Sequence, residues 1–413
     1  METPLFLRKK KLFFVFTSAA KPVWTRYGSE TDLSTFIGSL AAILYKFQNY
    51  YTGIQDSLRY LRTADMYVVF LCTEALFYVC ISKGKDSLES LYNQLRMLHT
   101  KVISTLTDNI TTMLISRPSY DARNLMGGTH SALDYLIRTT AVSPSMLDAF
   151  MPVPMLAQHR SQIQLSFKSH LDDDLLYGFI MTSTSIIYRY CRKGENIHHI
   201  DTSLLFNMLA SHSSLRSTMS WTPICLPNFS DKGFVYAYIT FLQDSQVGLA
   251  LLSDNSAAFK NLKACGDAIE TEIRGLLPII EESVKSIPYS VSICGIKEFK
   301  HFIYMTKAVD QYTMSGFTPS TRDFLPEMPI DIYKRTLRRY FAAYKLSNIP
   351  EFFKGNYTKI DTYKNEQIVA LRTNEYVLFA SLSSMLPAAA VVQLTTQLLR
   401  WLKSQEQDFF IMR

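Results

Sequence analysis

Apolar and polar positions along this chain fall into a repeating order of short strands and amphipathic helices. Leu12–Thr17 and Val23–Tyr27 are apolar runs around a turn at 19–22, and this pattern predicts a strand pair. A helix is predicted next, because the following apolar residues recur every three or four positions along one stripe. The members of this stripe are Leu33, Phe36, Ile37, Leu40, Leu44 and Phe47.

Three more strands and a second helix complete the first round of elements. The strands are expected near Tyr60, Val68 and Val79. A coiled coil would show the same spacing of apolar residues as the helix, but the run is short, so we expect a helix packed on a sheet. The residues spaced alternately by three and four are Leu88, Leu91, Leu95, Leu98 and Val102.

The same order of elements recurs twice further along the chain. The second round has strands within Leu175–Tyr190 and a hairpin at Trp221, and the third begins with a strand at Phe299–Thr306. We therefore predict an α+β protein with domains at residues 1–150, 171–290 and 291–413, and a connector rich in Pro and Met at 151–170. The other elements expected are helices at Asp201–Ser211, Ser256–Arg274, Ile330–Lys345 and from Pro387, and strands at Val247–Leu252 and near Phe353, Ile368 and Val377.

Four segments of the chain have distinctive residue patterns. Residues 220–239 read SWTPICLPNFSDKGFVYAYI, a short strand, a turn at 230–233 and a strand of alternating aromatic residues. The others are LFFVFTSAAKPVWTRYGSE at 12–30, RPSYDARNLMGG at 117–128 and LLRWLKSQEQDFFI at 398–411. All four resemble, in the same order, segments of the SAND family, the Mon subunit of the Mon–Ccz complex.

The resemblance implies three longin domains in tandem. A longin domain is an antiparallel sheet with one face covered by helices, which leaves its edge strands and its first helix available for pairing. The first domain is then implied to pair with a Ccz-type longin partner. The second and third domains are implied to mediate complex assembly and membrane contact.

Composition agrees with a folded chain of about three domains. The 413 residues are 47% hydrophobic and 13% aromatic, which is ample for several cores. Thr73 and Glu74 interrupt the longest apolar stretch, Met66–Ile81, and a bilayer span needs ~20 apolar residues, so two paired strands fit better. No cleavage site follows the basic and apolar start, and only about ten residues precede the first strand. We expect a cytoplasmic protein. Members of the resembled family often carry a long acidic extension before the first strand, and both trimming and natural absence of that extension stay open here.

Cysteine usage and charge argue against several functions. The six cysteines include no Cys-x-x-Cys pair and lie mostly in apolar runs, so we expect free thiols in a reducing compartment and no structural zinc. The net charge of +7 is mild and is not interleaved with aromatic residues, which argues against nucleic-acid binding. An anionic membrane surface or an acidic protein partner is the better use of this charge.

The sequence contains no motif for covalent chemistry. A P-loop, a G-x-G-x-x-G motif and a Gly-x-Ser-x-Gly elbow are all absent. His198, His199 and Asp201 could ligate a metal, but adjacent histidines point in different directions, which favours a loop in which Asp201 caps the next helix. Asp172–Asp174 is interpreted in the same way, as a solvated turn. We expect no metal, no cofactor and no covalent catalysis.

One basic helix is a candidate membrane contact. Aromatic residues occupy one of its faces, and no acidic residue lies between Ile332 and Ile349 to offset the charge on the other face, although a solvated face remains the alternative. Each basic residue contributes ~1 kcal/mol near an anionic leaflet, so four support weak, salt-sensitive recruitment to an anionic or phosphoinositide membrane. The run Arg8–Lys11 adds to this charge. The four cations of the helix are Lys334, Arg335, Arg338 and Arg339.

The opening hairpin is the second candidate surface. Trp24 and Arg26 share one face of the second strand, where Trp24 either packs in the core or contacts a partner. The resemblance implies a Rab GTPase bound to the joint surface of two longin domains. It assigns the contacts with the partner and the Rab to the exposed side of the helix from Glu30 to Tyr45 and to Lys21, Pro22, Trp24, Arg26, Tyr27, Gly28 and Glu30.

The function implied by the resemblance is guanine-nucleotide exchange on a late-endosomal or vacuolar Rab GTPase. This chain would be one subunit of a heteromeric exchange factor, recruited peripherally to the late endosome or vacuole. Such a complex holds the nucleotide-free Rab more tightly than the GDP-bound form, so it needs no nucleophile. The alternative is a longin-built trafficking adaptor or tether subunit without exchange activity.

Overall fold

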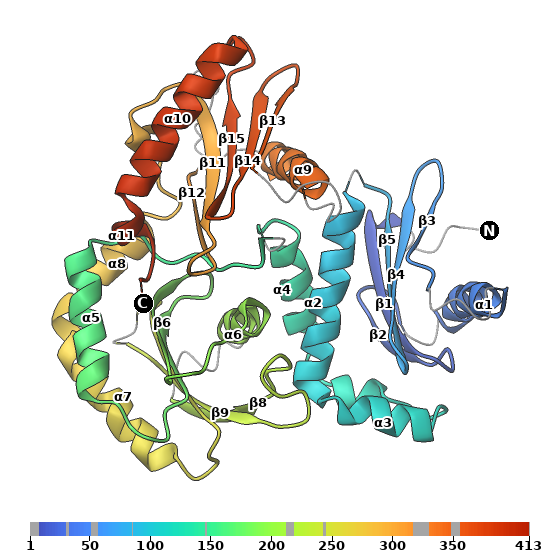
Figure 1. Cartoon of the computed structure of the whole chain (residues 1–413). Coiled ribbons are helices and arrows are strands. Elements are labelled where there is room, and N and C mark those ends of the chain that lie inside the picture. The colour runs from blue at the N-terminus through green and yellow to red at the C-terminus, as the bar shows by residue number, and fades with distance from the viewer. Residues whose placement is uncertain are drawn as a thin grey trace. The chain divides into compact units, whose positions relative to one another are not determined.

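A computed structural model describes residues 8–29, 33–50, 57–84, 86–144, 147–211, 219–242, 245–316, 330–347 and 356–412. The chain divides into two compact units, Met1–Ser143 with Ile224–Phe234, and Pro144–Pro223 with Val235–Arg413. Within these described residues, three antiparallel sheets of five strands each recur along the chain (Figure 1). The predicted α+β class and its threefold recurrence are therefore confirmed.

The first sheet has the strand order β2-β1-β5-β4-β3, and its paired strands are antiparallel. The apolar stretch at 66–81 forms the pair β4 and β5, as predicted. The strands are β1 (Lys11–Thr17), β2 (Pro22–Thr25), β3 (Tyr60–Arg62), β4 (Tyr67–Cys72) and β5 (Leu76–Ser82).

Helices cover both faces of the first sheet. α1 (Ser34–Tyr50) packs on one face together with Phe14 and Phe16 of β1. Side chains of α2 (Leu88–Leu106) and α4 (His130–Thr140) share the other core with Phe13 of β1. The expectation of a single covered face was wrong, because β1 and β5 are apolar at successive positions, as strands buried on both faces are. The remaining short helices here are α3 (Asn109–Ser116) and η2 (Arg123–Met126).

The second sheet has the order β7-β6-β10-β9-β8. α6 (His199–Ser211) lies on one face, while α5 (Ala157–Ser169) and α7 (Phe259–Ile273) lie on the other (Figure 1). The segment expected to be a connector thus contains α5, whose Ile163 and Phe167 are buried in this domain's core. The further elements are β6 (Tyr177–Met181), β7 (Ile186–Cys191), β8 (Ser220–Ile224), β9 (Val235–Phe241), β10 (Gly248–Ser253), η5 (Arg274–Leu276) and α8 (Leu277–Lys285).

The third sheet has the order β12-β11-β15-β14-β13. α9 (Ile330–Ser347) covers one face and α10 (Ala388–Ser404) covers the other. The position near Phe353, where a strand was expected, lies outside the described residues. The further elements are η6 (Val291–Cys294), β11 (Phe299–Thr306), β12 (Gln311–Met314), β13 (Tyr357–Thr362), β14 (Gln367–Arg372), β15 (Tyr376–Leu382) and α11 (Glu406–Phe409).

The loop between β8 and β9 belongs to the first unit, although both strands belong to the second sheet. Within that unit, the backbone N–H of Asp108, just after α2, donates to the carbonyl oxygen of Asp231 at 2.8 Å. Cys225 and Leu226 of the same loop are buried. The turn of the distinctive hairpin at 220–239 therefore contributes to the packing of the first unit.

Candidate functional site

Large apolar side chains are exposed along one edge of the first domain. α1 buries Ile37 and Leu44 against the sheet, so its opposite side faces outward. Ile43 and Tyr50 are 42% and 79% exposed. Tyr45, whose ring contacts that of Phe77 in β5, is 38% exposed at the border of the buried side. Tyr60 and Leu61 of β3 are 49% and 36% exposed. We call this set the α1–β3 surface: Ile43, Tyr45, Tyr50, Tyr60 and Leu61.

α1 and β3 lie at the same side of the first sheet (Figure 1). Leu58 and Met66, which flank β3, pack against the core cluster that contains the buried side of α1. Among the described strands, β3 pairs with β4 and ends the sheet, so one of its edges carries backbone donors and acceptors without a neighbouring strand. An open edge beside exposed apolar side chains is typical of a surface that pairs with another sheet.

Trp24 is a core residue of the first domain. Its side chain is 3% exposed, and its indole Nε1 donates a hydrogen bond to Nδ1 of His130 at 3.0 Å. The two ring centroids are 5.5 Å apart. His130 begins α4, a helix that the sequence pattern did not reveal. The structure therefore corrects the assignment of Trp24 to a partner-binding surface and supports its alternative as a packing residue.

Arg26 is also held inside the first domain. Its Nε donates to Oδ1 of Asp134 in α4 at 2.7 Å. Its guanidinium lies 5.9 Å from the ring centroid of Phe13 and 5.2 Å from that of Tyr27. The carboxylate of Asp134 also pairs with Arg138. Arg26 thus joins the hairpin to α4, which corrects its assignment to a displayed contact.

Other residues of the opening hairpin remain accessible. Lys21 and Gly28 are exposed, while Pro22 and Tyr27 are half-buried. Gly28 has a φ of 88°, a left-handed conformation that a side chain would strain. Glu30 lies outside the described residues. The hairpin can therefore offer Lys21, Pro22, Tyr27 and Gly28 to a partner.

Two of the four distinctive segments meet in space at this hairpin. η2, within the segment at 117–128, packs against β2. Hydrogen bonds from Arg123 lower the pKa of Asp121 to about 2, and the charge of Lys21 contributes in the same direction. The Nη2 of Arg123 lies 2.5 Å from Oδ2 of Asp121. These three charged residues form an exposed polar patch at the hairpin turn.

The four cations of α9 do not share one environment. Arg339 forms an ion pair with Glu366 and lies 3.8 Å from the ring centroid of Tyr363. Glu366 is buried and also accepts hydrogen bonds from Thr336 at 3.1 Å and Ser381 at 2.6 Å. Arg339 is therefore part of the packing of the third domain, which corrects its assignment to a lipid-binding face.

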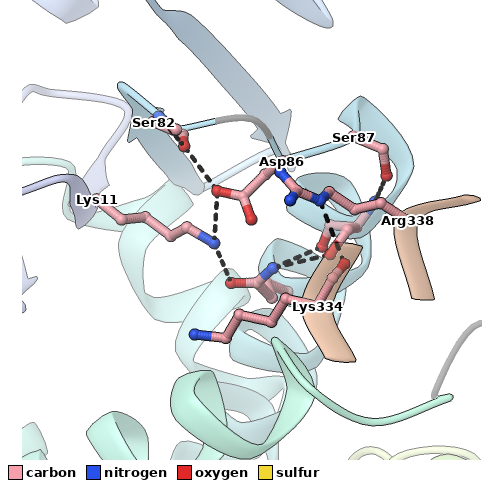
Figure 2. Close-up of polar contacts among 9 residues, drawn as sticks. Lys11, Ser82, Asp86, Ser87, Lys334 and Arg338 are labelled. Carbon is pink, nitrogen blue, oxygen red and sulfur yellow. Dashed lines mark hydrogen bonds and ion pairs between the residues drawn. The ribbon is translucent and has the colours of Figure 1, made fainter. Parts of the chain in front are cut away.

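The other three cations of α9 are half-buried. The Nε of Arg338 donates to the backbone carbonyl oxygen of Lys334 at 3.2 Å (Figure 2). Arg335, the residue after Lys334, is half-buried, and its Nε is buried. Lys334, Arg335 and Arg338 remain the candidates for the predicted membrane contact.

Lys11, the last residue of the basic run at 8–11, is engaged within the first domain (Figure 2). Its Nζ lies 3.1 Å from Oδ2 of Asp86 and donates to Oε1 of Gln94 at 3.3 Å. Asp86 also accepts a hydrogen bond from Ser82 at 2.9 Å, and Gln94 donates to the carbonyl oxygen of Ser90 at 2.9 Å. The charge of Lys11 is therefore balanced locally, at the junction of β5 and α2.

Burial disfavours the reactive thiolate form at several cysteines of this chain. All six cysteines are free, and burial raises the pKa of Cys72 and Cys265 to about 11 and that of Cys80 to about 12. Among these described residues, no group of three His, Cys, Asp or Glu side chains is placed to hold a metal ion. In the same part of the chain, no helix has the length and apolar character to cross a membrane.

The sequence contained a partial signal for the α1–β3 surface. Ile43 and Tyr45 are apolar residues of α1 that lie off its predicted buried stripe, and their exposure follows from that position. Tyr60 and Leu61 gave no comparable signal. Their importance depends on β3 being the last strand of the sheet, which only the strand order reveals.

Family models match all three domains. The first, second and third longin domains of FUZ, MON1 and HPS1 match residues 11–136, 173–270 and 298–406. Each matched range contains most of one of the five-stranded sheets.

Curated proteins with similar sequences extend over nearly the whole chain. Vacuolar fusion protein MON1 homolog A of Gallus gallus is 27% identical over 410 residues, which cover 98% of this chain and 72% of that protein. Protein SAND of Takifugu rubripes is 27% identical over 423 residues, with 100% of this chain and 78% of that protein covered. Vacuolar fusion protein MON1 of Yarrowia lipolytica is 32% identical over 331 residues, with coverage of 79% and 60%.

Proposed function

The chain belongs to the MON1/SAND family of three-longin proteins, and on this premise we propose that it is one subunit of a heteromeric guanine-nucleotide exchange factor. Its substrate is a late-endosomal or vacuolar Rab GTPase. Several relatives are named vacuolar fusion proteins, which supports a role in membrane fusion and vesicle traffic. The proposed complex acts at the late endosome or vacuole as a peripheral membrane assembly.

The α1–β3 surface carries this proposal. Exposed tyrosine, isoleucine and leucine side chains lie beside an open strand edge on the first domain. A second longin domain can extend the sheet through β3 and cover the apolar side of α1. We therefore assign this surface to the Ccz-type partner subunit, and the two first domains together form the platform for the Rab.

The proposed exchange mechanism is differential binding. The platform opens switch I of the Rab and disturbs its magnesium and nucleotide site, so the nucleotide-free form is held more tightly than the GDP-bound form. The chain supplies shape and charge. The accessible hairpin residues Lys21, Pro22, Tyr27 and Gly28 are the proposed Rab contacts, with Arg123 beside them.

Membrane recruitment is assigned to the third domain. Lys334, Arg335 and Arg338 of α9 supply positive charge, while Arg339 is committed to Glu366. Three basic residues near an anionic leaflet contribute roughly 3 kcal/mol together, which suits weak and salt-sensitive attachment.

Release of a fluorescent GDP analogue from the Rab tests the proposal. Release is followed with this chain alone, with a co-expressed Ccz-type partner, with the partner alone and with buffer. We expect acceleration only when both subunits are present, because the platform needs two first domains.

Two results would contradict exchange activity in different ways. A stable complex of the two subunits without any acceleration would assign the chain to the adaptor or tether class. Full acceleration by this chain alone would show that the joint platform is unnecessary.

A further inference from the structure

Residues 150–153 join the edges of the second and third sheets. Phe150 forms a parallel bridge with Gln311 of β12, and Pro152 forms one with Ile186 of β7. The N–H of Tyr312 donates to the carbonyl oxygen of Phe150 at 3.0 Å. On the other side, the N–H of Val153 donates to the carbonyl oxygen of Ile186 at 2.7 Å. One short segment therefore pairs with the edge strand β12 of the third sheet and with the edge strand β7 of the second sheet.

The 405–411 segment, which contains α11, adds a second connection between the same two domains. The carboxylate of Asp408 accepts a hydrogen bond from the N–H of Ala157, the first residue of α5, at 2.8 Å. The carbonyl oxygen of Asp408 accepts another from the N–H of Met155 at 3.0 Å. Asp408 thereby satisfies an N-terminal donor of a helix that lies 251 residues earlier in the chain.

The end of this segment is fixed to the third sheet by a reciprocal pair of hydrogen bonds. The side chain of Gln311, which is fully buried, donates to the carbonyl oxygen of Ile411 at 2.9 Å. The N–H of Ile411 donates in return to Oε1 of Gln311 at 2.8 Å. Because Gln311 also lies opposite Phe150, both connections meet at β12.

Arg160 of α5 links the three chain segments at this junction. Its Nη1 donates to the carbonyl oxygen of Ile187 at 2.8 Å, and its Nη2 donates to those of Val153 at 2.9 Å and Asp408 at 3.1 Å. The side chain is 6% exposed, and burial lowers its pKa to about 10, although the nearby charge of Asp408 opposes the shift. Burial of a cation costs free energy unless the cation is hydrogen-bonded. The planar guanidinium of Arg160 meets this condition because its N–H groups point in different directions, toward three carbonyl oxygens.

We propose that Arg160, Asp408 and Gln311 form a clasp that makes the second and third longin domains one rigid, cooperative body. When a partner or a membrane binds and displaces the third domain, the second domain then moves with it as one body. This inference does not depend on exchange activity, because it rests on contacts inside the unit formed by Pro144–Pro223 and Val235–Arg413.

Hydrogen exchange of the full chain tests the clasp, with Arg160→Met and Asp408→Ala as variants. Methionine keeps much of the apolar stem of Arg160 and removes its donors, while alanine removes the carboxylate that accepts the hydrogen bond from the N–H of Ala157. We expect protection to fall roughly tenfold or more at 150–157 and 405–411 in both variants, with β9, β10, β14 and β15 unchanged. Arg192→Met is the matched control, because Arg192 forms an exposed ion pair with Asp254.

Three other outcomes of the hydrogen-exchange measurement would contradict the clasp. Unchanged protection at 150–157 and 405–411 would mean that the contacts do not couple the domains. Equal loss of protection across β9 and β10 would mean that Arg160 only stabilises the core of the second domain. The loss of protection in the double variant can be expressed as a free energy and compared with the sum of the two single losses. If the two are equal, Arg160 and Asp408 act independently.

Discussion

The indole Nε1 of Trp24 donates a hydrogen bond to Nδ1 of His130 at 3.0 Å, across 106 positions of the chain. This bond joins β2 to α4, and the Trp24 side chain is buried in the core between them. Trp24, a residue of the opening segment that resembles the family, therefore packs in the core of the first domain. Its substitution should be tested as a change in stability before any effect on a partner is considered.

Trp24→Ala should lower the free energy of unfolding of the first unit by about 3–5 kcal/mol, the usual cost of truncating a buried large aromatic residue. Urea unfolding of the full chain, followed by hydrogen exchange in β1 and β5, measures this loss. The prediction fails if the variant keeps its stability and loses only its partner.

Ile43→Asp should weaken pairing with the longin partner at least tenfold, because it introduces a charge into the α1–β3 surface. The stability of the chain should change by less than about 0.5 kcal/mol, since the side chain is already exposed. Affinity is measured by titration of the purified partner. Ile115→Asp in α3 is the matched control, with a comparably exposed isoleucine outside the surface. Equal losses in both variants would remove the pairing role from α1.

The cations of α9 should separate into two classes. Reversing Lys334, Arg335 and Arg338 to Glu should reduce flotation with anionic liposomes and leave the fold intact. Arg339→Met should instead cost about 3 kcal/mol in the third domain, because it leaves Glu366 without its cation. Flotation and urea unfolding are measured on the same preparations. Loss of flotation with Arg339→Met at unchanged stability would contradict the division.

Stability of the third domain should fall as the pH drops below about 6.5. His301 is fully buried, and burial lowers its pKa to about 3, so the unfolded chain takes up a proton that the folded chain does not. Stability is therefore complete above the unfolded pKa and is lost progressively between about 6.5 and 3. Between about pH 7 and about pH 5.5 the loss from this residue is about 1 kcal/mol.

His301→Gln provides the comparison for this pH dependence, because glutamine does not titrate. Urea unfolding at the two pH values should give a smaller loss in the variant than in the original chain. Equal losses would show that groups other than His301 control the effect.

The regular elements followed closely from the sequence. The stripe predicted for the helix at 33–47 is the buried side of α1, and the interrupted apolar stretch at 66–81 is the pair β4 and β5. These predictions succeeded because hydrophobic periodicity is a local signal. The helices α3 and α4 were missed because they have only 8 and 11 residues, so each offers few repeats of the helical spacing.

The surfaces were harder to predict than the elements. A basic pattern placed Arg339 with its neighbours, but the buried Glu366 that pairs with it lies in a different hairpin. Similarly, Arg26 looked displayed until α4 supplied Asp134. A sequence pattern gives the side of an element on which a charge lies, whereas its partner depends on which elements the fold brings beside it.

The loop at 224–234 has a consequence for the order in which the chain becomes structured during synthesis. The first unit is discontinuous: its residues up to 143 emerge from the ribosome before the loop that completes it. At roughly 5–20 residues per second, the 80 intervening residues at 144–223 take several seconds to translate. During that interval the N–H of Asp108, just after α2, lacks the carbonyl oxygen of Asp231 to which it donates in the folded chain. The first domain is thus synthesised first but completed only after about half of the second domain has been made.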